Sequence, residues 1–159
     1  MAEHRNTCRR SAFTLVEVGL VVATIAVLSA IAIPRYASAM NRYRVELAAK
    51  RVVADLMLAR SVARGSGAGQ VIDFTAPVNG YTLPGVASPN GRAGDYAVRL
   101  SVAPYSATVS SVSFGTGAAT SVRFTRYGTP EAGGNVVVSA GGYEKTILLD
   151  AVTGRAEVR

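Results

Sequence analysis

Histidine, cysteine and tryptophan are almost missing from this sequence of 159 residues. The one histidine, His4, and the one cysteine, Cys8, both lie close to the N-terminus, and there is no tryptophan. Beyond Cys8 the chain therefore has no residues for a Ser-His-Asp or Cys-His nucleophile system, or for a metal site built from histidine or cysteine. A domain formed by the later residues also has no disulfide, so its own packing, or packing against its neighbours, must stabilise it.

Other signatures of catalysis are also missing. The sequence contains no phosphate-binding loop, no Gly-x-Gly-x-x-Gly motif after a predicted strand and no acidic spacing typical of an EF-hand. The six acidic residues after Gly65 form no distinctive pair. We therefore expect no enzyme, no cofactor and no bound metal.

What the sequence does have is a long apolar run near the N-terminus. No charged residue occurs from Val18 to Pro34, and counting from Phe13 gives 21 residues up to Ile33, interrupted only by Glu17. As a helix this run would be about 30 Å long, which is the thickness of the hydrocarbon core of a bilayer. Three arginines precede it in residues 1–12 and favour a cytoplasmic N-terminus, so the chain from Arg35 onward should be exported.

Glu17 separates the possible interpretations of this run. An ordinary secretory signal could be cut after Ala32, in the segment Ala30-Ile31-Ala32, and this alternative stays open. A lipoprotein signal needs a cysteine just after the run, whereas Cys8 lies before it. A carboxylate within an apolar span costs about 2 to 3 kcal/mol unless it is paired, and an ordinary signal has no use for it.

Residues 9–18, Arg-Arg-Ser-Ala-Phe-Thr-Leu-Val-Glu-Val, resemble the class III leader of type IV prepilins and type II secretion pseudopilins. This resemblance implies cleavage between Ala12 and Phe13 and N-methylation of Phe13, both by a prepilin peptidase and methyltransferase. It also implies that Glu17 is the glutamate at the fifth mature position and that Pro34 is the proline near the twenty-second, both acting in assembly. Ala12 departs from the family, which usually has glycine there.

The spacing has a physical reason of its own. Cleavage after Ala12 would create a positively charged α-amino group on Phe13, four residues before Glu17 and on the same face of a helix. In a medium of low dielectric constant the two charges neutralise each other, within one chain or between neighbouring subunits.

Beyond Pro34 the helical pattern becomes amphipathic. Apolar residues recur at alternating spacings of four and three, which aligns them on one face of a helix. They are Val45, Ala49, Val52, Leu56, Ala59 and Ala63. The charged residues of this segment, Asp55 among them, are assigned to the other faces, and the glycines from Gly65 to Gly69 should end the helix. We predict one long helix from Phe13 to about Arg64.

From Gln70 onward the sequence favours β-structure. Eight short runs of β-branched and apolar residues alternate with Gly, Pro and Asn clusters. The predicted strands are Val71-Phe74, Tyr81-Leu83, Tyr96-Val102, Thr108-Phe114, Val122-Thr125, Val136-Ala140, Thr146-Leu149 and Ala156-Val158. We predict an α+β fold with a small antiparallel β domain. One face of this domain is covered by the second half of the helix, and the other face is exposed to solvent. The expected organisation is a leader (1–12), a transmembrane half-helix (13–34), an amphipathic half-helix (35–64) and a β-rich head (65–159).

Three later segments resemble the GspH/FimT group of minor pilins and pseudopilins. They are Met57-Ala63, Val122-Pro130 and Thr153-Val158. The resemblance implies a head made of two small sheets, an inner-membrane protein with one span and a periplasmic head, and assembly with other pilins into a filament. It favours a GspH-like minor pseudopilin of the type II secretion system, with a FimT/FimU-like minor type IV pilin, in pilus biogenesis or DNA uptake, as the alternative.

The formal net charge of +7 raises the question of nucleic-acid binding. Residues 35–64 hold seven basic and two acidic residues, whereas the head holds seven basic and six acidic residues, so the head is no broad surface for phosphate. The basic helix is interpreted as a solvated surface, a lipid-facing surface or one that pairs with acidic neighbours. Some FimT-like pilins bind DNA through a C-terminal motif beginning Gly-Arg, which makes Arg155 and Arg159 candidate contacts; a tight turn at Gly154 is the simpler interpretation.

Overall fold

The computed structural model describes residues 13–74, 79–88 and 94–159, and it divides into two units. The first ends at Ala37 and the second comprises Ser38–Arg159. One helix, α1 (Leu15–Ser66), runs through both and matches the predicted helix to within two residues at each end. Eight strands follow, one for each predicted run: β1 (Gln70–Asp73), β2 (Gly80–Ala87), β3 (Asp95–Arg99), β4 (Thr108–Phe114), β5 (Ser121–Phe124), β6 (Gly134–Ala140), β7 (Tyr143–Leu149) and β8 (Ala156–Val158).

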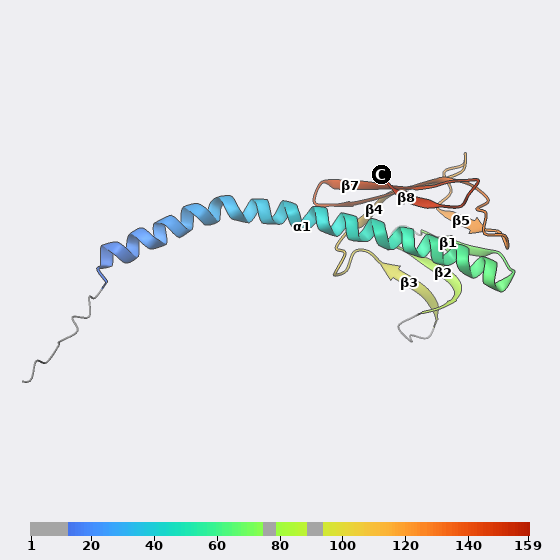
Figure 1. Cartoon of the computed structure of the whole chain (residues 1–159), viewed down its shortest axis with the longest axis horizontal. Helices are drawn as coiled ribbons and strands as arrows, with labels where there is room; N and C mark the ends of the chain where they lie inside the picture. The colour runs from blue at the N-terminus through green and yellow to red at the C-terminus, as the bar shows by residue number, and fades with distance from the viewer. Residues whose placement is uncertain (1–12, 75–78, 89–93) are drawn as a thin grey trace, which may run out of the picture. The chain divides into compact units, whose positions relative to one another are not determined.

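The strands form two antiparallel sheets of four (Figure 1). The first has the order β3-β2-β1-β5 and the second the order β4-β6-β7-β8. Phe74, which follows β1, joins the two sheets, because its ring lies 5.1 Å from that of Tyr81 in β2 and 5.9 Å from that of Phe114 in β4. The predicted antiparallel β domain is therefore confirmed, and it is built as a pair of small sheets.

The second half of α1 packs on both sheets through the predicted apolar stripe. All six residues of the stripe are buried, and Ala48 is buried beside them. Four of these seven residues are alanines, whose short side chains let the sheets approach the helix closely. The shared core includes Ile72 and Leu83 of the first sheet and Val138 and Ile147 of the second. The structure thus confirms the predicted fold class, a long N-terminal helix on antiparallel β structure.

Local sequence explains where α1 ends. Gly67 adopts a left-handed conformation with φ of 66°, which suits glycine just beyond a helix. The Ser66 hydroxyl donates to the carbonyl of Val62 and accepts from the N–H of Ala68, so it satisfies two backbone groups at this end. The glycine-rich segment predicted to stop the helix does so, although the helix continues through Gly65.

Four strands, β2, β3, β6 and β7, differ from their predicted lengths, and of these β6 and β7 begin two and three residues earlier than predicted. β3 ends at Arg99, whereas the alternating pattern predicted a strand as far as Val102, which is exposed in a turn that brings Ala107 N–H to the carbonyl of Leu100. β2 continues past the predicted end at Leu83, through Pro84, because a register shift in its pairing with β3 accommodates the missing N–H. The alternation itself is confirmed in β6, where Val136, Val138 and Ala140 are buried and the residues between them are partly exposed.

Candidate functional site

The first half of α1 is apolar and exposed to its surroundings. Large side chains are uncovered all along it, from Leu15 at 89% exposed to Ile33 at 68%. Within the residues that the structure describes, α1 is the one helix long and apolar enough to cross a membrane, judged by length and composition. An isolated apolar helix of this kind needs either lipid or neighbouring helices to cover it.

Glu17 lies in the first turn of α1, and Phe13 lies just before the helix. The Thr14 hydroxyl accepts the backbone N–H of Glu17 at 3.2 Å, so Thr14 caps the helix. Thr14-Leu15-Val16-Glu17 has the spacing of a capping box, a signal present in the sequence that our interpretation missed. A carboxylate in the first turn is also stabilised by the helix dipole. Glu17 therefore has a local role as well as the predicted role in assembly, which stays a prediction.

The other predicted residues of the N-terminal segment are placed as follows. Pro34 lies inside α1, where it cannot donate the backbone hydrogen bond that the carbonyl of Ala30 would otherwise accept. The leader, with Ala12 on one side of the predicted cleavage bond, lies outside the described residues, whereas Phe13 is described and is 78% exposed. Cleavage, methylation and the part played by Pro34 stay predictions.

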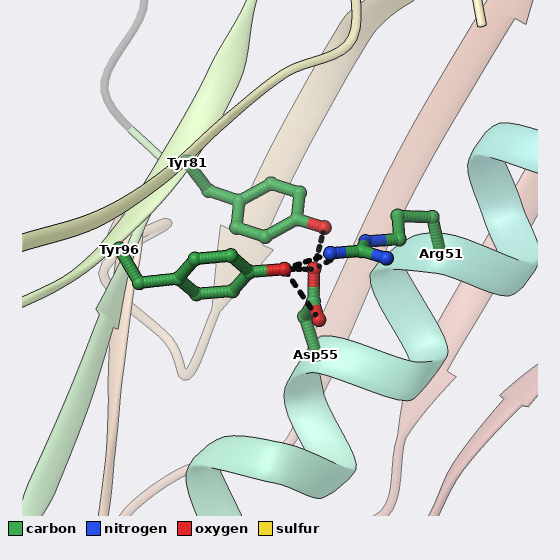
Figure 2. Close-up of polar contacts among 4 residues, drawn as sticks. All are labelled: Arg51, Asp55, Tyr81 and Tyr96. Atoms are coloured by element: carbon green, nitrogen blue, oxygen red, sulfur yellow. Dashed lines mark hydrogen bonds and ion pairs between the residues drawn. The ribbon is translucent and has the colours of Figure 1, made fainter. Parts of the chain in front are cut away.

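Asp55 corrects one sequence-based assignment. We had placed it among the charged residues on the outer faces of the helix, but it is buried, with 4% of its surface exposed. Its carboxylate accepts hydrogen bonds from the hydroxyls of Tyr81 at 2.5 Å and Tyr96 at 3.0 Å, and from Arg51 Nε at 2.9 Å (Figure 2). Arg51 also donates to the Tyr96 hydroxyl. Hydrogen bonds among these four side chains connect one flank of α1 to β2 and β3.

This cluster changes the acidity of both tyrosines. Burial, and then the negative charge of Asp55, raises the pKa of Tyr81 above its ordinary value. The same two causes raise the pKa of Tyr96. Both phenols therefore remain protonated and able to donate hydrogen bonds to Asp55 well into the alkaline range. Sequence alone gave no sign of this arrangement, because the tyrosines come from strands that are 26 and 41 residues away from Asp55.

The opposite flank of α1 forms hydrogen bonds with a loop of the head near the C-terminal end of the helix. Arg60 Nε donates to the carbonyl of Gly128 at 3.1 Å, and Arg64 Nε donates to that of Tyr127 at 2.9 Å. Both carbonyls belong to the loop between β5 and β6, which reverses direction through Gly128 with φ of 77°. Gly154 lies against the same loop, since a Cβ there would be 2.7 Å from the Gly128 oxygen.

This junction unites the three separate segments on which the resemblance of the head rests. Met57–Ala63 contributes Arg60, Val122–Pro130 contributes Gly128, and Thr153–Val158 contributes Gly154. In that last loop, Asp150 Oδ1 accepts the backbone N–H groups of Val152 and Thr153, and these bonds lower the pKa of Asp150. The junction combines one arginine donor on the helix, Arg60, with close contact between two loops at Gly128 and Gly154.

The two candidate DNA contacts lie at the C-terminal strand. Arg155 is exposed and forms an ion pair with Glu157 at 3.0 Å. Arg159 continues the pairing with β7, since its N–H donates to the carbonyl of Thr146 at 2.8 Å. Both arginines line a shallow depression of about 650 Å³ on the second sheet. The tight turn at Gly154 is present, with φ of 64°, and DNA binding by Arg155 and Arg159 stays a prediction.

The described part of the chain holds no group of three or more His, Cys, Asp or Glu side chains arranged to bind a metal ion. It also holds no buried side-chain nitrogen or oxygen without a hydrogen-bond partner.

The fold of a long helix on two small antiparallel sheets is shared with a solved protein structure. The chain is similar to the type IV minor pilin FimU of Pseudomonas aeruginosa PAO1 in one crystal form, with a TM-score of 0.55 and 19% identity over 74% of this chain and 90% of FimU. In a second crystal form the TM-score is 0.52, with 18% identity over 72% of this chain and 91% of FimU. At these identities the similarity establishes the fold.

The family follows from a profile match. Residues 48–153 match the family described as type II transport protein GspH, and this chain belongs to that family. No match was found among curated protein sequences. Family and fold together identify a component of the pilin and pseudopilin class, and they do not separate type II secretion from pilus function.

The contact between the two loops predicts a position-specific effect of adding a methyl group. Gly154→Ala would place a Cβ 2.7 Å from the Gly128 carbonyl oxygen and 3.0 Å from Pro130, whereas Gly142→Ala meets nothing within 4 Å. Both glycines have positive φ, so each substitution costs about 1 to 2 kcal/mol of conformational strain. Gly154→Ala should cost about 1 to 3 kcal/mol more from overpacking. Urea unfolding of a fragment of residues 38–159 measures both; equal losses would contradict the proposed contact.

The raised pKa of Tyr81 predicts a loss of stability at alkaline pH. A phenol whose folded-state pKa lies above its unfolded value of about 10 stabilises the fold fully below that pH, and this contribution is lost as the pH rises further. The free energy of unfolding should be flat up to about pH 9 and fall above about pH 10, by up to about 1.4 kcal/mol per pH unit for this phenol. Tyr81→Phe should make the decline shallower.

The matched control is Tyr127→Phe, because Tyr127 is 65% exposed. It should leave the alkaline slope of the same fragment unchanged, as measured by urea unfolding at intervals of pH. A wild-type slope that survives Tyr81→Phe would show that other groups control the alkaline transition.

Proposed function

We propose that this chain is a minor pseudopilin of a type II secretion system, which assembles with other pseudopilins into a filament for protein secretion across the outer membrane. The observation that carries the proposal is the match of residues 48–153 to the GspH family. The junction of Arg60, Gly128 and Gly154 supports it, because it gives the family-like segments of the head a common structural purpose.

In this proposal the chain is anchored in the bacterial inner membrane with its N-terminus cytoplasmic and its head periplasmic. Residues 1–12 are removed by prepilin peptidase, Phe13 is methylated, and residues 13–34 span the membrane before they enter the filament core. The apolar, uncovered surface of α1 from Leu15 to Ile33 supports this assignment, because it suits lipid first and neighbouring helices later.

Glu17 would act in assembly by meeting the α-amino group of a processed subunit. It lies in the first turn of α1, four residues after Phe13, so its carboxylate and an amine at that terminus lie at similar depths in the membrane. When helices pack side by side in low dielectric, a pair of this kind favours one register over others. Pro34 would contribute by leaving the Ala30 carbonyl without its helical donor near the membrane surface.

The second candidate is a minor type IV pilin that acts in pilus biogenesis or DNA uptake. The similarity of fold to FimU favours it. In this case Arg155 and Arg159, both exposed on the second sheet, are the proposed contacts for DNA.

Deletion of the gene in its native bacterium distinguishes the two candidates. We expect proteins secreted by the type II system to accumulate in the periplasm and disappear from the culture medium, while surface pili and twitching motility remain. Loss of pili with intact secretion would assign the chain to the second candidate. A strain in which neither process changes would contradict both.

The N-terminal assignment predicts which residue is the first of the mature protein. It also predicts that the negative charge of Glu17 is required for assembly. Mass spectrometry of the membrane-bound protein should identify N-methylated Phe13 as the first residue; a terminus at Ile33 would show an ordinary secretory signal instead. Glu17→Gln should be processed normally but should be missing from sheared or cross-linked filaments. Glu131→Gln is the matched control, because Glu131 is an exposed acid of the head, and it should enter filaments at the wild-type level.

A further inference from the structure

Basic side chains gather along one flank of α1 within Ser38–Arg159. Arg42 lies 4.8 Å from the centre of the Tyr143 ring, and Arg60 and Arg64 donate to the loop between β5 and β6. Two cations of the head lie beside them: Lys145 lowers the pKa of Glu46 along with Lys50, and Arg126 lies over the ring of Tyr127, next to the carbonyl that Arg64 contacts. We call this surface the basic flank; it comprises Arg42, Lys50, Arg60, Arg64, Arg126 and Lys145.

The basic flank lacks acidic partners of its own. The one carboxylate within it is Glu46, which already pairs with Lys50 at 2.8 Å. Over residues 13–74, 79–88 and 94–159, none of Arg42, Arg60 and Arg126 forms an ion pair with an acid, and neither does Arg64. These guanidinium groups are held by rings and backbone carbonyls, which fix their positions and leave their positive charge uncompensated.

A second copy of this chain could not supply the missing negative charge. Residues 35–159 contain eight acidic residues, and six of them are already engaged. The engaged acids are Glu46, Asp55, Asp95, Glu131, Asp150 and Glu157. Among the described acids of residues 35–159, only Asp73 and Glu144 have neither an ion pair nor a side-chain hydrogen bond. Two copies side by side would therefore bring mostly positive surfaces together, which disfavours self-association.

We propose that the basic flank is the docking surface for a pilin-like subunit whose exported part is acidic. The inference rests on the proposed role of the chain in a filament and adds the chemistry of its neighbour. Complementary charge attracts the acidic subunit and repulsion rejects a second copy, so the chain is inserted singly between acidic neighbours. Selection by charge would explain why this chain enters the filament as a minor subunit.

The length of the flank favours a protein partner over lipid headgroups. Arg42 and Arg64 are 22 residues apart on one helix, which corresponds to about 33 Å along its axis. The headgroup layer on one side of a bilayer is only about 5 to 8 Å deep, so it could contact one end of the flank at most. A neighbouring subunit with a long helix of its own matches the full length.

Binding of full-length proteins in a neutral detergent tests the proposal. The probes are the pilin-like subunits of the same bacterium whose exported parts have a net negative charge, a second copy of this chain, and a single-stranded oligonucleotide. We expect at least one acidic subunit to bind, with an affinity that falls about tenfold or more between 50 and 500 mM NaCl, and no self-association at the same concentrations.

Single substitutions distinguish binding at the basic flank from an effect of the overall positive charge of the protein. Arg42→Gln and Arg126→Gln should each weaken binding of the acidic subunit about fivefold, and the double variant by more than tenfold. Arg99→Gln is the matched control, because Arg99 is exposed on β3, away from the flank, and it should change the affinity less than twofold. Equal effects of all three single substitutions would overturn the proposal, and so would binding that is independent of salt.

The remaining outcomes are also decisive. Tighter binding of the oligonucleotide than of any acidic subunit would overturn the proposal and assign the flank to nucleic acid. Self-association as strong as binding to the acidic subunits would overturn it as well. Failure of the proposed function is seen separately, in the gene deletion: a strain with normal secretion and normal pili contradicts the filament role whatever the flank binds.

Discussion

The burial of one alanine-rich stripe of α1 against two small sheets is the contact on which the rest of this structure depends. Each sheet consists of four short strands and has an apolar face that must be covered. The stripe from Val45 to Ala63 lies between them and completes a single core that includes residues of both sheets. Without disulfides, this packing is the main source of stability for the head.

Polar contacts on the two flanks of the helix then fix its orientation on the sheets. On one flank Asp55 and Arg51 meet the tyrosines of β2 and β3, and on the other Arg60 and Arg64 hold the loop after β5. An apolar stripe of alanines and valines could slide along the sheets at little cost, whereas these directional bonds can form in only one register. Arg51 and Asp55 therefore serve internal contacts, whereas Arg60 and Arg64 both hold a loop of the head and belong to the basic flank.

The part of α1 before Ser38 has a surface suited to a different environment. There its apolar side chains are uncovered. This separation suits a protein of the pilin class, because the apolar half can pass from lipid to a bundle of neighbouring helices while the core of the head stays intact. On the proposed basic flank, charge would then select which neighbours are accepted.

The sequence alone determined the helix, all eight strands and the apolar stripe, because each depends on local periodicity and on turn-forming residues that act within a few positions. It also contained the Thr14 capping signal, which a closer inspection of residues 14–17 would have found. The early end of β3 at Arg99 was missed because alternation continues to Val102 although the chain has already turned. Only the tertiary structure decided the burial of Asp55, the meeting of Gly128 with Gly154 and the gathering of Arg42, Lys145 and Arg126 on one flank. These arrangements join residues far apart in the chain, and no local pattern records which polar side chains a fold will bring together.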